Sequence, residues 1–134
     1  MAREYPHDIE AERSLLGSML ISKDACNEIL SLATKDDFYL ESHRTLFEAM
    51  QAIDSQNNPV DVTTLTSYLM DKKVLDKVGG VEYLLQLSES VPTTAHSHYY
   101  LKILNEKSLL RKLIQQSTKI IEDAYGEVDN INDF

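Results

Sequence analysis

The sequence predicts an all-α fold in which a compact helical bundle, the head, is followed by one long helix. The chain of 134 residues contains only 4 Gly and 3 Pro, whereas helix-forming residues such as Leu, Ala, Glu and Lys are plentiful. Its content of 43% hydrophobic and 26% charged residues is typical of a globular domain. Apolar side chains also recur at the spacing of amphipathic helices in successive segments.

The first two helices are predicted from their start signals. Asp8 and Ser22 are suited to the N-cap position, because a side-chain oxygen there accepts a hydrogen bond from a free backbone N–H group. Apolar residues follow both of them at helical spacing. Residues 34–39 are then expected to form a tight connector whose Phe38 enters the core.

Three further helices complete the head, which we assign to residues 1–94. A third helix is predicted to begin near Ser42 and to end before the Asn-Pro pair at residues 58–59, because proline cannot continue a helix. Asp61 is suited to cap a fourth helix. The Gly-Gly pair at residues 79–80 breaks the chain before a fifth helix.

One long helix is predicted from near residue 95 to residue 125. At about 1.5 Å per residue it is roughly 45 Å long, more than the span of a domain of this size, so its far end must project. An apolar stripe in water is unfavourable and requires a partner helix from this chain or another. The residues predicted to form this hairpin and oligomerisation stripe are Leu110, Leu113, Ile114, Ser117, Ile120, Ile121 and Ala124.

A return helix is predicted to begin after the long one. Gly126 is suited to a helix C-cap, and Asp129 to the N-cap of a new helix. We therefore assign residues 95–134 to a long helix and the start of the return arm of a helical hairpin, which is cut early in that arm.

Charge and cysteine content narrow the possible partners and compartment. Asp and Glu outnumber Lys and Arg by 22 to 13, for a net charge of -9, which argues against a phosphate backbone as the primary ligand. The single cysteine, Cys26, is expected to be a buried thiol in a reducing compartment. Residues 1–8 lack an apolar signal region, and no stretch is long enough to span a membrane. We expect a cytoplasmic chain with no membrane association.

No residue pattern indicates catalysis or metal binding. The Gly-Gly pair at residues 79–80 precedes an acidic residue where a phosphate would lie. His96 and His98 have a spacing that points them to different faces of a helix. His7 and His43 are interpreted as capping or surface residues, and the Asp pair at residues 36–37 as turn chemistry.

Several segments, in order along nearly the whole chain, carry a resemblance to a known family. They are residues 9–17 (IEAERSLLG), 37–39 (DFY) with His43, 59–64 (PVDVTT), 78–84 (VGGVEYL), 91–95 (VPTTA), 99–100 (YY) and 106–114 (EKSLLRKLI). Together they resemble the amino-terminal domain of bacterial replicative DnaB-type helicases.

This resemblance implies a helical head and a hairpin that assemble, as a trimer of dimers, into a hexameric collar above a ring of ATPase motor domains. ATP and magnesium are expected in the motor domain, and DNA contact only through the complete ring. For this chain it implies self-association and docking of the carboxy-terminal domain of primase, with a helicase loader as a possible further partner. No catalytic, cofactor or metal residues are expected, so this chain alone is not an enzyme.

By resemblance, the primase-contact positions fall on Glu10, Tyr83, Ile114 and Ile120. For Ile114 and Ile120 packing inside the hairpin is an equally good interpretation, and Glu10 is also well placed to interact with a helix dipole.

A second hypothesis is an accessory module that contacts nucleic acid through basic residues of the long helix. These are Lys102, Lys107, Arg111, Lys112 and Lys119. A solvated face explains them more simply, and the net charge argues against DNA as the main ligand. A small enzyme is disfavoured, because no acid, base, nucleophile or cofactor loop converges.

Overall fold

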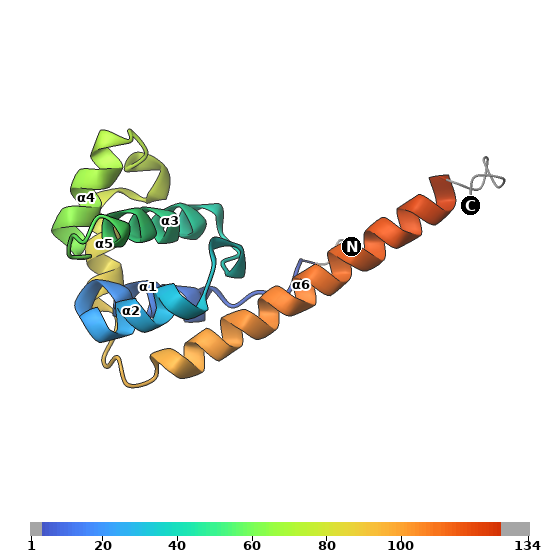
Figure 1. The fold of residues 1–134 in the computed structure, drawn as a ribbon, viewed down its shortest axis with the longest axis horizontal. Helices are drawn as coiled ribbons and strands as arrows, with labels where there is room; N and C mark the ends of the chain where they lie inside the picture. Colours follow the sequence, from blue (N-terminus) through green and yellow to red (C-terminus); the bar gives the residue numbers. More distant parts are fainter. Residues whose placement is uncertain (1–3, 127–134) are drawn as a thin grey trace.

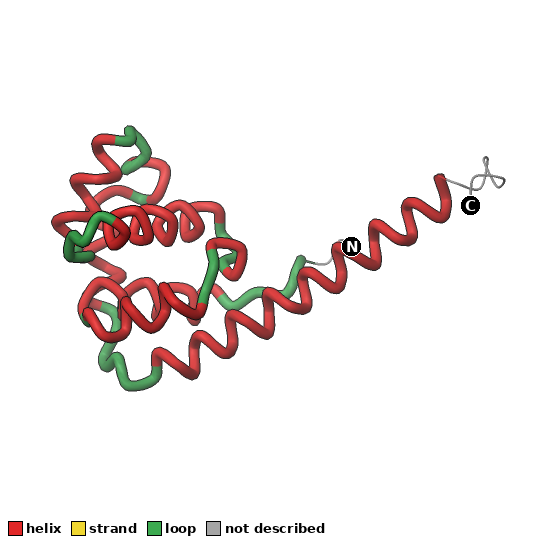
Figure 2. The backbone as a smooth tube through the Cα atoms, in the orientation of Figure 1, coloured by secondary structure: helices red, strands yellow, loops and turns green. Residues whose placement is uncertain are grey.

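A computed structural model describes residues 4–126, and within that range the chain is helical with no strand. The all-α prediction is confirmed. Figure 2 shows helices joined by short loops. The α-helices are α1 (Ile9–Ile21), α2 (Lys23–Leu32), α3 (Glu41–Ser55), α4 (Val62–Asp71), α5 (Gly80–Glu89) and α6 (Ser97–Gly126), with short 3-10 turns η1 (Lys35–Asp37) and η2 (Asp76–Val78).

The predicted N-caps are confirmed. Asp8 and Ser22 each accept a hydrogen bond from the backbone N–H three residues later, at 3.0 and 3.1 Å. Asp61 accepts from the Thr64 N–H at 2.8 Å, while the Thr64 hydroxyl accepts from the Asp61 N–H at 3.0 Å. These reciprocal bonds satisfy donors that the first turn of a helix leaves free.

The connector between α2 and α3 is also formed as predicted. Asp37 stabilises the turn, as predicted, because its carboxylate accepts a hydrogen bond from the Thr34 N–H at 2.8 Å. Phe38 is fully buried and packs against Phe47 of α3, with ring centroids 5.1 Å apart. The connector therefore contributes an aromatic side chain to the centre of the head.

Helix α1 is the central element, in contact with α2, α3, α5 and α6. Figure 1 shows α1 and α2 between α6 on one side and α3, α4 and α5 on the other. Gly17 allows a close approach of α1 and α5. A Cβ atom at this position would lie 2.3 Å from the Leu87 carbonyl oxygen and 2.5 Å from Val91 Cγ2, so no larger residue fits without displacement.

Helix α6 begins on the head and continues well beyond it (Figure 1). Residues 97–111, the inner half, pack on α1, α2 and η1. Residues 112–126, the outer half, are all exposed. Gly126 is the last residue of α6, and the return helix predicted from Asp129 lies outside the described residues. No helix in residues 4–126 is long and apolar enough to cross a membrane.

Candidate functional site

The residues predicted to form the hairpin stripe are all exposed on α6, Leu110 at the end of the inner half and the others in the outer half. We call them the outer face: Leu110, Leu113, Ile114, Ser117, Ile120, Ile121 and Ala124. Leu113, Ile120 and Ile121 are 55%, 67% and 55% exposed. A run of large apolar side chains in water is characteristic of a surface that binds another protein segment.

The residues that the inner half of α6 buries against the head are not those of the predicted apolar stripe. It consists of Ser97, Leu101, Leu104, Ser108 and Arg111, which are spaced three or four residues apart, as one face of a helix requires. Two of the positions of the inner half that face the head are therefore occupied by polar residues, a serine and an arginine.

Arg111 anchors α6 where it leaves the head. Its guanidinium donates to the Pro6 carbonyl at 2.9 Å and to the Asp36 and Asp37 carbonyls at 3.1 Å each. It also lies 5.8 Å from the centroid of the Tyr39 ring. Burial lowers the pKa of Arg111. The interpretation of Arg111 as part of a solvated basic face is wrong, because Arg111 is buried and its hydrogen-bond partners belong to the head.

The rest of the basic set remains near or at the surface. Lys102, Lys112 and Lys119 are exposed, and Lys107 is half-buried. Lys119 pairs with Asp123 at 3.2 Å on the same helix. With Arg111 in the interior, the set offers less positive charge than the sequence alone indicates.

Two of the predicted primase-contact residues lie together on the head. Arg13 is 3.8 Å from the Glu10 carboxylate, and its guanidinium carbon lies 5.8 Å from the Tyr83 ring centroid. Glu10 is exposed and Tyr83 half-buried. We call Glu10, Arg13 and Tyr83 the head face. Ile114 and Ile120 lie apart from it in the fold, on α6 beyond Arg111.

Beneath the head face lies a buried chain of hydrogen bonds. His43 Nε2 is 2.6 Å from the Tyr83 hydroxyl, and His43 Nδ1 is 2.8 Å from Glu12 Oε1. The other oxygen of Glu12 accepts from the Tyr39 N–H at 2.7 Å. His43 and Glu12 are 0% and 1% exposed. The chain therefore links α1, α3 and α5 through polar groups within the core.

The interpretation of His43 as a capping or surface residue is wrong, because it is fully buried. Its partners, Glu12 and Tyr83, lie 31 and 40 residues away in the sequence. No local sequence pattern predicts hydrogen bonds between residues so far apart in the chain. The one signal that could have indicated these hydrogen bonds was the chemistry of the three side chains, because imidazole and carboxylate groups need hydrogen-bond partners when they are buried.

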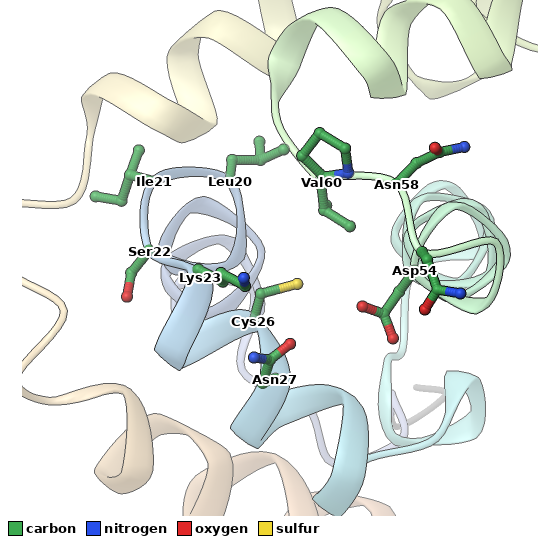
Figure 3. Close-up of a pocket in the computed structure, with 11 residues that line it drawn as sticks. Leu20, Ile21, Ser22, Lys23, Cys26, Asn27, Asp54, Asn58 and Val60 are labelled. Atoms are coloured by element: carbon green, nitrogen blue, oxygen red, sulfur yellow. The ribbon is translucent and has the colours of Figure 1, made fainter.

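A cavity of about 480 Å³ opens between the α1–α2 junction and the loop that follows α3 (Figure 3). Leu20, Cys26 and Val60 contribute apolar surface, and Cys26 faces Asp54 across the cavity. Burial, reinforced by the negative charge of Asp54, raises the pKa of Cys26 to about 11. The thiol is therefore protonated near neutral pH and is a poor nucleophile. The prediction that Cys26 is buried is confirmed.

Metal ligation finds no support in the described part of the chain. No group of three or more His, Cys, Asp or Glu side chains in residues 4–126 is arranged to hold a metal ion. His98 instead lies 3.0 Å from Glu28 on the surface. Gly80 opens α5, as expected of a residue at a helix start.

Comparison with known proteins identifies the family. Residues 4–106 match the sequence profile described as the DnaB-like helicase N terminal domain. This chain belongs to that family. The solved N-terminal domain of DnaB helicase from Mycobacterium tuberculosis is similar to this DnaB-like domain with a TM-score of 0.86 and 36% identity, covering 91% of this chain and 88% of that one.

Two longer relatives are also similar to this DnaB-like domain. The replicative DNA helicase DnaC of Bacillus subtilis (strain 168) is 40% identical over 96% of this chain, which spans 28% of that helicase. A solved DnaB-like replicative helicase matches with a TM-score of 0.78 and 25% identity, covering 94% of this chain and 31% of that structure. The fold and the family resemblance predicted from the sequence are confirmed.

Proposed function

We propose that this DnaB-like domain forms part of the collar of a replicative DNA helicase, where it associates with further copies of itself and docks primase. Its relatives are replicative DNA helicases, and the solved DnaB-like helicase was described with its interactions with primase. ATP and magnesium then belong to the motor domain of the whole protein, and DNA is engaged by the complete ring. The cytoplasm is the corresponding location.

The observation that carries this proposal is the exposed outer face of α6. Leu113, Ile114, Ile120 and Ile121 are 40–67% exposed on a helix that has left its own head. Burial of such side chains yields about 25 cal/mol per Å² of apolar surface removed from water. A return helix and the corresponding helix of a neighbouring copy are the occupants that fit, in the dimers and hexamer of the collar.

Primase docking is proposed to use both exposed surfaces. The head face offers a carboxylate and an aromatic ring, Glu10 and Tyr83, held close together by Arg13. The outer face offers Ile114 and Ile120. Aromatic and arginine side chains are enriched at the centres of protein interfaces. A helicase loader is a further proposed partner of the same collar.

Size-exclusion chromatography with light scattering, with and without the carboxy-terminal domain of the cognate primase, tests both surfaces. We expect a mass above the monomer and a co-eluting complex. Ile114→Asp should lower the self-associated mass, and Tyr83→Ala should weaken the complex. Leu32→Asp is the matched control, because Leu32 is also exposed, at 54%, but belongs to neither face.

Two outcomes of this experiment would contradict the proposed function. If the chain stays monomeric and binds no primase when the return helix is supplied as a longer chain, the proposed function is wrong. If single-stranded DNA binds instead, with an affinity that falls steeply as salt increases, the nucleic-acid hypothesis for the basic residues of α6 is favoured.

A further inference from the structure

Several contacts within the head hold the Tyr83 side chain in place in the unbound domain. Its hydroxyl lies 2.6 Å from the Nε2 of a fully buried His43, so the hydroxyl points into the head. The two rings are nearly parallel, with centroids 6.0 Å apart. A Cβ atom at Gly79 would lie 2.7 Å from Tyr83 Cβ, so the backbone passes close to the base of the side chain. The exposed part of Tyr83 is therefore its ring.

The direction of the hydrogen bonds follows from the chemistry of Glu12. An ionised carboxylate only accepts, so His43 Nδ1 donates to Glu12. In the neutral imidazole Nε2 then carries no proton and accepts from the Tyr83 hydroxyl. Burial raises the pKa of Tyr83, which keeps that hydroxyl protonated and able to donate. Each member thus fixes the orientation of the next.

The geometry points to Glu12 and His43 as positioning residues that lock the Tyr83 ring in the orientation in which it meets primase. This inference rests on the proposed docking of primase at the head face. A side chain that is already immobilised loses less conformational entropy when it binds. The Tyr83 hydroxyl then contributes to affinity by holding the ring in place, without contact with the partner.

Tyr83→Phe is the central test, because it keeps the ring and removes only the hydroxyl. Affinity for the primase carboxy-terminal domain is measured by isothermal titration calorimetry for the wild type, Tyr83→Phe and Tyr83→Ala. We expect about tenfold weaker binding for Tyr83→Phe, the size expected when one side chain loses its preorganisation, and a larger loss for Tyr83→Ala. Ile29→Val, a buried change on α2, is the control and should bind as the wild type does.

A mutant cycle separates positioning from general destabilisation. His43→Leu should weaken binding as Tyr83→Phe does, and the double variant should be no weaker than either single variant, because both changes remove the same hydrogen bond between His43 and Tyr83. His43→Gln should restore binding, since its amide can both donate to Glu12 and accept from Tyr83. Side-chain NMR couplings should show one χ1 rotamer of residue 83 in the wild type and averaging in Tyr83→Phe.

The outcomes distinguish this inference from the proposal beneath it. If Tyr83→Ala abolishes binding but Tyr83→Phe binds like the wild type with a single χ1 rotamer, the positioning role is wrong while docking at the head face stands. If Tyr83→Ala also binds like the wild type, the head face is not the docking surface and both are wrong. The measurements on Tyr83→Phe test the positioning role even if the His43→Leu variant fails to fold.

Discussion

The two halves of α6 differ sharply although they belong to one continuous helix. In the inner half, residues 97–111, Leu101 and Leu104 are buried against the head, and so are the polar Ser108 and Arg111. In the outer half, residues 112–126, every side chain is exposed. Leucines and isoleucines occur in both halves, so hydrophobicity does not decide which residues are buried. What decides is whether a surface of matching shape and polarity faces them.

The inner half shows how such a surface selects its residues. The carbonyls of Pro6, Asp36 and Asp37 converge on one point of the head, and only a side chain with several N–H donors satisfies them all. Arginine therefore occupies a buried position that a leucine would fill in an apolar interface. The outer half has no such surface within the described residues.

The largest expected effect contrasts two leucines of the same helix. Leu104→Ala should lower the free energy of unfolding by about 3 kcal/mol, because Leu104 is 1% exposed and its truncation leaves a cavity. Leu113→Ala should change it by less than about 0.5 kcal/mol in dilute monomer, because Leu113 is 55% exposed. Urea unfolding followed by circular dichroism measures both. Equal effects would show that the outer half is buried in solution.

Arg111→Lys should lower the free energy of unfolding by about 2 kcal/mol, because lysine keeps the charge but cannot reach three carbonyls in the planar arrangement of guanidinium. The same urea unfolding measures it. Lys112→Arg, the adjacent exposed position, is the control and should be neutral. A neutral Arg111→Lys would contradict the anchoring role.

Ser108→Ala should raise the free energy of unfolding by about 1 kcal/mol. Within the described residues the Ser108 hydroxyl is buried and makes no hydrogen bond, and such a group costs free energy that a methyl group avoids. The shift of the thermal midpoint measures the gain. A loss of stability would mean that the hydroxyl has a bonding partner in solution.

The smallest effect is expected at Lys119. Its ion pair with Asp123 spans 3.2 Å between side chains that are 70% and 61% exposed, and exposed pairs of this kind contribute little. Lys119→Ala should change the free energy of unfolding by less than about 0.5 kcal/mol at physiological salt. A larger loss at Lys119 than at Arg111 would reverse the contrast between the two halves.

Local signals predicted the fold well. Asp8, Ser22 and Asp61 were found as N-caps because a cap and the N–H group that it binds lie within three residues. The projecting end of α6 followed from its length alone. Periodicity and capping depend only on neighbouring residues, so one sequence carries them in full.

The candidate site was predicted only in part, because its central contacts join distant segments. Glu10 and Tyr83 came from the resemblance, and the structure brings them together through Arg13. Their contact with primase, like that of Ile114 and Ile120, stays a prediction. The roles of His43 and Arg111 were missed, since their partners lie 31 to 105 residues away and only folding brings them near.

The anchorage of α6 at Arg111 makes this helix a lever with its pivot at the edge of the head. Beyond the pivot the outer half extends about 22 Å, at 1.5 Å per residue. A tilt of about 10° at Arg111 therefore moves the far end by about 4 Å, roughly three quarters of the rise of one helical turn, about 5.4 Å. Small adjustments of the segment around Pro6 or of η1 are magnified at the tip, where we propose that a partner helix packs.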